Sequence, residues 1–342
     1  MVQTVNDFQH AESCLKKGEE PAAEKIYLQC ICNEDYGPLA YYRLGEIYNR
    51  RGEIDKALQA HKNAFRRDRQ LARRLTNSDH PNHDYVFETT TDTKVERCTL
   101  CGTEGKGHSV YNLMTDIGFV AGFNPVRLWM YCDDCHHLFA GNRPSDLGGV
   151  LSASNPGHYQ SPRQQYFSIM SDILNKISLH AEGTDFLEIG VGAGEMIAVA
   201  KEMDFNVTGI EIRPSYARSV SEIFDIDVRA VGFEEFQSEI NYDVICMGDV
   251  IEHVIDPIQT LKKAAGLLKK RGILWISTPN FESAVARALK DQNPMWRTTQ
   301  HLNYFSYASL KRVLHQLGFQ PLNYQVSNRY VGSMEIIAKK SD

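Results

Sequence analysis

The sequence predicts an α/β fold, in which a doubly wound parallel sheet occupies the C-terminal half of the chain and smaller units precede it. From Asp185 onward, short apolar runs alternate with helical patterns, which is typical of parallel strands joined by crossover helices. A glycine-rich loop follows the first apolar run, where such a sheet commonly binds a ligand. Before Asp185 the pattern changes to similar helical segments and two C-x-x-C pairs, which predict an α-helical repeat segment and a small metal-binding unit.

Length and charge narrow the class of protein. A chain of 342 residues predicts two or three domains of about 100–200 residues each. The net charge of −6 argues against a nucleic-acid partner, because dedicated nucleic-acid binders usually carry a basic excess. The first residues lack the basic-then-apolar pattern of a secretion signal, and no apolar run reaches about 18 residues. We therefore expect a cytoplasmic protein with no membrane partner.

Residues 1–78 contain two similar helical segments. At an offset of 34 residues, Gly18 aligns with Gly52 and Ala23 with Ala57. The second copy, residues 41–69, has large and small residues where a tetratricopeptide repeat needs them for two antiparallel helices to pack closely. The segment thus resembles a pair of such repeats, which implies a surface for a protein partner or for self-association. A helical cap or a dimerisation arm fits the same pattern.

Residues 80–141 contain four cysteines in two C-x-x-C pairs. Each pair can place two thiolates on one side of a tetrahedral zinc ion, so we expect one closed zinc site with a structural role. Its predicted ligands are Cys98, Cys101, Cys132 and Cys135. The apolar stretches Gly118–Phe123 and Val126–Tyr131 are candidates for the strands of this zinc ribbon. The following residues, 142–157, are rich in Gly, Pro, Ser and Asn and predict a linker.

The third unit, residues 158–342, begins with a predicted helix over Gln164–Ile177 and continues with the alternating pattern. The apolar runs predict five strands. These are Phe186–Ile189, Val207–Ile212, Asp227–Ala230, Val244–Met247 and Gly272–Ser277.

The first of these strands leads into a loop with glycine at every second position, followed by a helical run over Met196–Met203. The loop glycines are Gly190, Gly192 and Gly194, and the next strand carries Glu211 near its end. Glycines let a ligand approach the backbone, and an acid at the end of the second strand can accept from ribose hydroxyls, so this unit predicts a nucleoside site. Glu195 stands where a dinucleotide fingerprint has its third glycine. Glu188, two residues before the loop, would repel a pyrophosphate and suits a cationic ligand.

These residues resemble the class I S-adenosylmethionine-dependent methyltransferases, which carry an E/D-x-G-x-G-x-G signature on a Rossmann-like sheet. The resemblance implies that S-adenosylmethionine is the cofactor and that Glu211 holds its ribose. It extends to a tyrosine before the first helix and to the ends of the third and fourth strands. The implied cofactor contacts are Glu188, Gly190, Gly192, Gly194, Glu211, Gly232, Phe233, Gly248, Asp249 and Tyr159. For Phe233, simple core packing is the alternative.

A second cluster of polar residues follows the fourth strand. Asp249, Glu252 and His253 have the spacing that would place them on one face of a helical turn, and His301 lies further along the chain. This D-x-x-E-H pattern resembles a branch that includes ubiquinone O-methyltransferases and small-RNA 2′-O-methyltransferases. In members of that branch, these positions bind a divalent cation. The resemblance implies a Mg or Mn site at these four residues; alternatively His253 is a general base without metal, or the cluster is structural.

The function predicted from the sequence is transfer of a methyl group to the oxygen of a small or glycan-type acceptor. A sugar, a nucleotide sugar or a secondary metabolite is favoured, since zinc ribbons precede similar domains in bacterial sugar and natural-product methyltransferases. Methylation of RNA 2′-hydroxyls is an alternative, supported by an arginine run and opposed by the net charge. The run comprises Arg66, Arg67, Arg69, Arg73 and Arg74. A different alternative is a scaffold that recruits a partner through the repeats and the ribbon.

Overall fold

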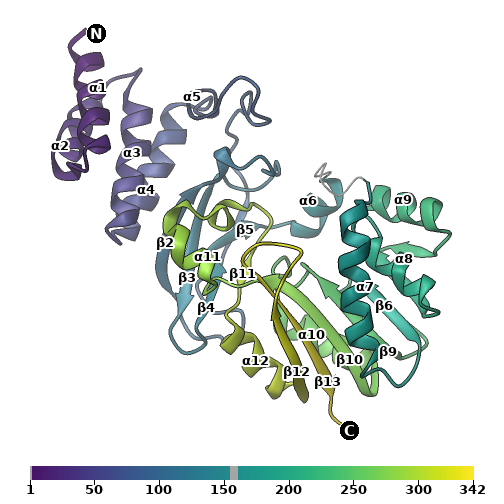
Figure 1. Cartoon of the computed structure of the whole chain (residues 1–342). Coiled ribbons are helices and arrows are strands. Elements are labelled where there is room, and N and C mark those ends of the chain that lie inside the picture. The colour runs from purple at the N-terminus through teal and green to yellow at the C-terminus, as the bar shows by residue number, and fades with distance from the viewer. Residues whose placement is uncertain (1, 155–160) are drawn as a thin grey trace.

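The computed structural model describes residues 2–154 and 161–342. Helices dominate the N-terminal part, a small sheet follows, and a large sheet with helices forms the rest (Figure 1). Among the described residues, no helix has both the length and the apolar character needed to span a membrane.

The N-terminal part is built from helices that pack in sequence order. They are α1 (Val2–Lys16), α2 (Glu20–Cys30), α3 (Gly37–Arg50), α4 (Ile54–Arg67) and the short α5 (Ala72–Leu75). Gly18 and Gly52, which the repeat comparison aligns, both have a positive φ, +79° and +73°, and each lies in the turn after a helix. Gly45 lets α3 approach α4 closely, because a Cβ atom there would lie 2.7 Å from Nε2 of His61. Helices thus occupy the predicted segment, and their assignment as tetratricopeptide-like repeats stays a prediction.

The small sheet has strand order β11-β4-β3-β2, and three of its strands are local in sequence. These are β2 (Lys106–Asn112), β3 (Val126–Cys132) and β4 (His137–Ala140), while β11 (Asn303–Tyr304) comes from the far end of the chain. A separate two-stranded ribbon joins β1 (Asp92–Lys94) and β5 (Asn142–Pro144). Residues 142–154, for which composition predicts a linker, thus contain β5 and also α6 (Leu147–Ala153). The N-terminus of α6 is capped by Asp146, whose side chain accepts from the Gly149 amide.

One predicted ribbon strand was wrong. Residues 118–123 form turns instead of a strand, although the stretch is apolar. The carboxylate of Asp116 accepts a hydrogen bond from the Gly118 amide at 3.1 Å, and Gly122 has a φ of +98°. Both features favour turns over extended backbone. The short 3₁₀ helix η1 (Leu113–Thr115) precedes them.

The large sheet has seven strands in the order β12-β13-β10-β9-β6-β7-β8. Their bounds are β6 (Asp185–Ile189), β7 (Asn206–Glu211), β8 (Val228–Ala230), β9 (Tyr242–Gly248), β10 (Leu268–Pro279), β12 (Phe319–Val326) and β13 (Ser333–Lys340). All five predicted strands are confirmed, with ends shifted by up to four residues at β10. The sheet is mixed instead of wholly parallel, because β12 and β13 pair antiparallel and β13 also runs antiparallel to β10. The short loop that joins β12 to β13 requires this direction.

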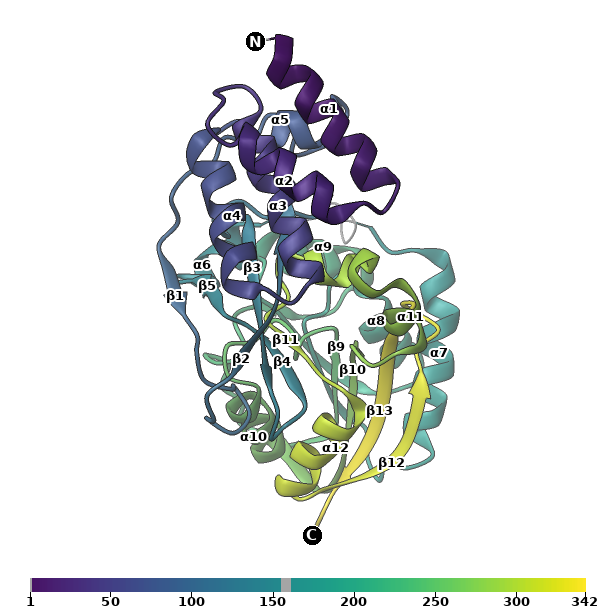
Figure 2. The same ribbon diagram turned by 90° about the vertical axis from the view of Figure 1, so that its left-hand side faces the viewer.

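Helices cover both faces of the large sheet, as the doubly wound prediction requires. On one face, α7 (Gln164–Ser178) and α8 (Glu195–Glu202) share a core with β6, β9 and β10. On the other, α10 (Pro257–Leu267) and α12 (Tyr307–Gln316) share a second core with the same strands. The remaining elements are α9 (Pro214–Phe224), α11 (Ala284–Leu289), η3 (Lys290–Gln292) and η4 (Pro294–Arg297). Figure 2 shows the small sheet lying between the N-terminal helices and the large sheet.

Candidate active site

The glycine loop lies at the carboxyl end of β6 and depends on its glycines. Gly190, Gly192 and Gly194 have φ values of +75°, +55° and +89°, a region that other residues adopt at a cost. Two of them are also close to neighbouring side chains. A Cβ atom at Gly190 would lie 2.9 Å from Cγ2 of Val250, and one at Gly194 would lie 2.7 Å from Cγ1 of Val220. The loop therefore presents bare backbone at the start of α8.

Glu211 and Glu188 flank this loop and differ in their hydrogen bonds. Glu211 is buried at the end of β7, and its Oε2 accepts from the Gly192 amide at 3.2 Å while its Oε1 accepts from the Arg213 amide at 3.0 Å. Glu188 is buried in β6, and burial raises its pKa to about 8, against the opposing effect of Arg329. Its Oε2 has no hydrogen-bond partner among the described residues. A cationic ligand beside Glu188 would favour its charged form.

The predicted adenine contacts have different surroundings. Gly232 follows β8, and a Cβ atom there would touch nothing closer than 3.7 Å, so its backbone is accessible from that side. Phe233 is 6% exposed and belongs to the core shared by α10 and α12. The ring of Phe233 is therefore a core side chain, in agreement with the alternative stated for it. Tyr159 lies outside the described residues.

Glu252, His253 and His301 meet at the carboxyl end of β9. One ligand atom from each lies within 4.8 Å of the others, and the two imidazole rings are 4.7 Å apart at 77°. Thr278 donates to Oε2 of Glu252 at 3.0 Å, whereas Oε1 is buried and has no partner in the described part of the chain. Burial raises the pKa of this carboxyl well above its usual range, and a cation beside it would favour its charged form. A buried carboxyl oxygen without a partner beside two imidazoles is chemically suited to a cation.

The hydrogen bonds of the two histidines assign their tautomers. Nδ1 of His253 lies 3.0 Å from the Gln300 carbonyl, which can only accept, so Nδ1 carries the proton. Nδ1 of His301 lies 2.9 Å from the Tyr304 hydroxyl, which itself donates to the Met295 carbonyl, so this Nδ1 also donates. Both Nε2 atoms therefore keep a lone pair. Burial lowers the pKa of His253 to about 4 and that of His301 well below its usual value, so both rings are neutral at physiological pH.

Asp249 does not join this group, contrary to the helical spacing predicted for it. Residues 249–253 form a bend and a turn instead of a helix, and Asp249 has a φ of +56°. Its Oδ1 accepts from the Ser277 hydroxyl at 3.2 Å, and its Oδ2 lies 3.2 Å from Nη1 of Arg329. The candidate cation site thus has three ligands instead of four. Arg329 is a residue that the sequence analysis missed, because no local motif links it to Asp249.

Comparison with known proteins identifies the region that contains this site. A family model described as "Methyltransferase domain" matches residues 162–324. Residues 162–324 therefore form a methyltransferase domain. A curated ubiquinone biosynthesis O-methyltransferase of Caulobacter vibrioides is 33% identical to this chain over 106 residues, which is 29% of the chain and 42% of that protein. A relative of the same name from Xanthomonas euvesicatoria pv. vesicatoria is 26% identical over 155 residues, or 42% of the chain and 65% of that protein. The chain therefore matches less than two thirds of the length of these relatives.

Solved structures are similar at low sequence identity. The 1,6-didemethyltoxoflavin-N1-methyltransferase of Burkholderia thailandensis, with S-adenosylhomocysteine bound, covers 63% of this chain at 19% identity and a TM-score of 0.46. The plantazolicin methyltransferase BpumL covers 57% at 13% identity, with the same TM-score.

Hydrogen bonds from residues at the edge of the small sheet hold the turn that carries Glu252 and His253. The backbone amides of Leu302 and Asn303 both donate to the Glu252 carbonyl, at 2.7 and 3.0 Å. Asn303 also donates to the Val254 carbonyl at 2.8 Å and accepts from the Thr99 hydroxyl at 2.8 Å. Thr99 lies between the first two predicted zinc ligands. A hydrogen-bonded chain therefore joins the cysteine cluster to the turn that carries His253.

The four predicted zinc ligands meet at one end of the small sheet. Their sulfur atoms lie within 4.8 Å of one another, and those of Cys101 and Cys132 are 3.6 Å apart. Thiolates around tetrahedral zinc at about 2.3 Å lie roughly 3.8 Å apart, so the cluster has suitable dimensions. Three of the four cysteines are buried, which suits a structural site.

Proposed function

We propose that this chain transfers the methyl group of S-adenosylmethionine to an oxygen of a small hydroxylated acceptor. The observation that carries the proposal is the convergence of Glu252, His253 and His301 at the carboxyl end of β9, with both Nε2 lone pairs available. This group lies at the same edge of the sheet as the glycine loop, where ligands of such sheets bind. The bound cofactor would supply an electrophilic methyl group.

On the cofactor side, the positive-φ glycine loop and Glu211 fit the nucleoside. Glu211 already bonds the Gly192 amide, so the two parts of the nucleoside site hold each other in place. Glu188 provides a buried acid beside the loop that the sulfonium or ammonium charge of the cofactor would ionise. These assignments extend to the accessible backbone of Gly232 and to Gly248, which lies beneath the Arg329 guanidinium.

On the acceptor side, neutral His253 can accept the hydroxyl proton through Nε2 as the oxygen attacks. The three residues also fit a divalent cation, which would lower the pKa of the acceptor hydroxyl. One carboxylate and two imidazoles suit Mn²⁺ better than Mg²⁺, which prefers oxygen ligands. With Asp249 held by Arg329 and Ser277, the site is less acidic than the sequence pattern implies.

The acceptor class is a phenol, a sugar or a related small hydroxylated compound. The curated relatives are named for ubiquinone biosynthesis O-methylation, which supports a small acceptor. Methylation of RNA is less well supported, because much of the arginine run is engaged within the protein. Arg73 pairs with Asp84 at 2.8 Å, and Arg69 donates to the Phe87 carbonyl at 2.9 Å.

We further propose that the segments outside the matched domain have supporting roles. Residues 1–78 are assigned as tetratricopeptide-like repeats for a protein partner or self-association, and residues 80–141 as a zinc ribbon. Residues 142–157 connect this ribbon to the unit 158–342. Purified protein is expected to contain close to one zinc per chain by elemental analysis.

The proposal is tested by calorimetry followed by an acceptor screen. Wild-type protein is expected to bind S-adenosylhomocysteine and to methylate members of a library of catechols, sugars and nucleotide sugars. His253→Ala should lose most turnover and keep its cofactor affinity, because the residue acts on the acceptor. The matched control His315→Ala removes an exposed histidine of α12 and should behave as wild type. Tight binding of NAD with no response to S-adenosylhomocysteine would refute the proposal.

The same assay separates metal from base chemistry. With a cation at Glu252, His253 and His301, a mild chelator that spares the cysteine cluster abolishes turnover, and Mn²⁺ or Mg²⁺ restores it. With His253 as a base alone, the chelator has no effect.

A further inference from the structure

Arg329 reaches the candidate cofactor site from outside the matched methyltransferase domain. It lies in the loop between β12 and β13, beyond residue 324 where the family match ends. From there its guanidinium extends over the end of β9, where a Cβ atom at Gly248 would lie 2.7 Å from its Nη1. A side chain at position 248 would therefore displace the end of the guanidinium.

The guanidinium is held in a buried acidic environment. Its side chain is 14% exposed, and Nη1 lies 3.2 Å from Oδ2 of Asp249, which is 10% exposed. Arg329 also favours the charged form of Glu188 in β6. The aromatic rings of Tyr166 and Tyr330 lie 6.0 and 5.0 Å from the guanidinium carbon. A cation is thus fixed between the ends of β6 and β9, beside the glycine loop.

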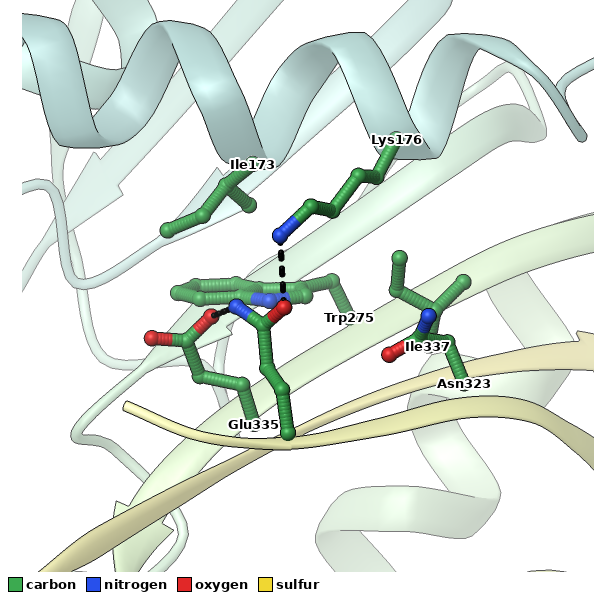
Figure 3. A pocket seen from close by; sticks show the side chains of 7 residues that line it. Ile173, Lys176, Trp275, Asn323, Glu335 and Ile337 are labelled. Atoms are coloured by element: carbon green, nitrogen blue, oxygen red, sulfur yellow. Dashed lines mark hydrogen bonds between the residues drawn. The ribbon is translucent and has the colours of Figure 1, made fainter. Parts of the chain in front are cut away.

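A further acidic group nearby is engaged through one of its two oxygens. Figure 3 shows Glu335 of β13 beneath the ring of Trp275, with Gln325 donating to its Oε2 at 2.6 Å and Lys176 donating to Gln325 at 2.6 Å. Asp249 is itself positioned by the Ser277 hydroxyl through its other oxygen. Asp249 can therefore stay in place if its contact with Arg329 is exchanged for another.

The orientation of the proposed cofactor requires a partner for an anion at this position. The nucleoside lies toward β7, where Glu211 ends the strand, so the methionine portion must extend toward β9, where the methyl group meets His253. That portion carries an α-carboxylate and an α-ammonium group. Resting on the proposed function, we infer that Arg329 binds the α-carboxylate of the cofactor and that Asp249 faces its α-ammonium group. In this arrangement the cofactor enters between the two members of the ion pair and satisfies both charges.

The test compares two ligands that differ in the amino-acid portion. S-adenosylhomocysteine carries the carboxylate, whereas 5′-methylthioadenosine has the same nucleoside and a thioether but no amino acid. By calorimetry, Arg329→Gln should lower the affinity for S-adenosylhomocysteine about 10- to 100-fold, as expected for the loss of a charged hydrogen bond. The same variant should change the affinity for methylthioadenosine less than twofold. Glu211→Gln is the reference variant and should lower the affinity for both ligands. Arg271→Gln removes an exposed arginine paired with Glu182 and should leave both affinities unchanged.

A ligand variant gives the same comparison without a mutation. The methyl ester of S-adenosylhomocysteine lacks the negative charge, so wild-type protein should bind it about as weakly as Arg329→Gln binds the parent compound. This measurement remains decisive if Arg329→Gln fails to fold.

The outcomes separate this inference from the proposed function. Equal losses for both ligands in Arg329→Gln, or an ester that binds wild type as tightly as the acid, overturn the role of Arg329 and leave the cofactor assignment intact. Failure of wild-type protein to bind either nucleoside overturns the proposed function and, with it, this inference.

Discussion

At the scale of single residues, the neutral state of His253 is the property with the clearest chemical consequence. Its Nδ1 proton is fixed by the Gln300 carbonyl, and burial lowers its pKa to about 4. An ordinary histidine titrates near 6.5, so half of such residues would be charged at that pH. His253 instead keeps its Nε2 lone pair throughout the physiological range.

We predict that His253 titrates near pH 4 in the folded, metal-free protein. NMR of the imidazole Cε1–H signal, assigned with His253→Gln, should show no titration between pH 5.5 and 8. Because the folded pKa is lower than the unfolded one, this residue also destabilises the fold as pH falls from 6.5 toward 4. A titration midpoint near 6.5 would contradict the burial and the hydrogen bond described here.

Local sequence patterns predicted the geometry of the glycine loop better than that of the histidine cluster. The glycine spacing and Glu211 depend on contacts within one strand–loop–strand unit, which a pattern can capture. Asp249 was placed wrongly because its positive φ ends the strand in a turn where the spacing suggested a helix. Arg329 was missed because its contact with Asp249 joins residues far apart in the chain, without any local signal.

At the scale of elements, the apolar runs predicted where the strands lie, but they did not predict which strands pair with one another. Each predicted strand of the large sheet is present, whereas nothing in the sequence indicated that β11 pairs with β4. Because β11 begins two residues after His301, this pairing anchors the segment that carries His301 to the small sheet. Arg127 of β3 adds to it, since its guanidinium donates to the Thr299 carbonyl at 2.8 Å.

We predict that Thr99→Val loosens the histidine site without disturbing the cysteine cluster. The change keeps the shape of the side chain but removes the hydroxyl that donates to Asn303. Losing this bond should cost about 1 kcal/mol and speed amide hydrogen exchange at Leu302 and Asn303 about fivefold. Zinc content and affinity for S-adenosylhomocysteine should not change.

The matched control is Thr103→Val, which removes an exposed hydrogen bond to Asp134 on the same ribbon. It should leave exchange at both amides as in wild type. Equal acceleration in the two variants would mean that the effect comes from the ribbon as a whole and would contradict a specific link through Thr99.

At the scale of the whole molecule, the N-terminal helices share a core with the small sheet. Buried residues of α4, including Ala64 and Phe65, form one cluster with Val110, Met114 and Val126. The Val110 amide also donates to the side chain of Asn49 in α3 at 2.7 Å. The helical segment is therefore a packed part of the molecule.

We predict that the protein unfolds in a single transition. Phe65→Ala deletes a ring that is 1% exposed and should destabilise the fold by about 3–5 kcal/mol. All three tryptophans lie outside the N-terminal helices, at positions 129, 275 and 296. In Phe65→Ala, the denaturant midpoints measured by tryptophan fluorescence and by far-ultraviolet circular dichroism should therefore fall by the same amount. The control Leu28→Ala, at an exposed site, should leave both midpoints unchanged. Separate midpoints for the two probes would show that the helices unfold independently.

The pairing of β11 with β4 also determines when this protein can finish folding on the ribosome. His137 and Asn303, which meet across the two strands, are 166 positions apart in the chain. At about 5–20 residues per second, translation leaves β4 without its neighbour for on the order of 10–30 seconds. During that interval the edge of β4, with Leu138 and Phe139, is open to any other nascent strand. The small sheet of the newly made N-terminal half is therefore complete only after residues 303–304 have been synthesised.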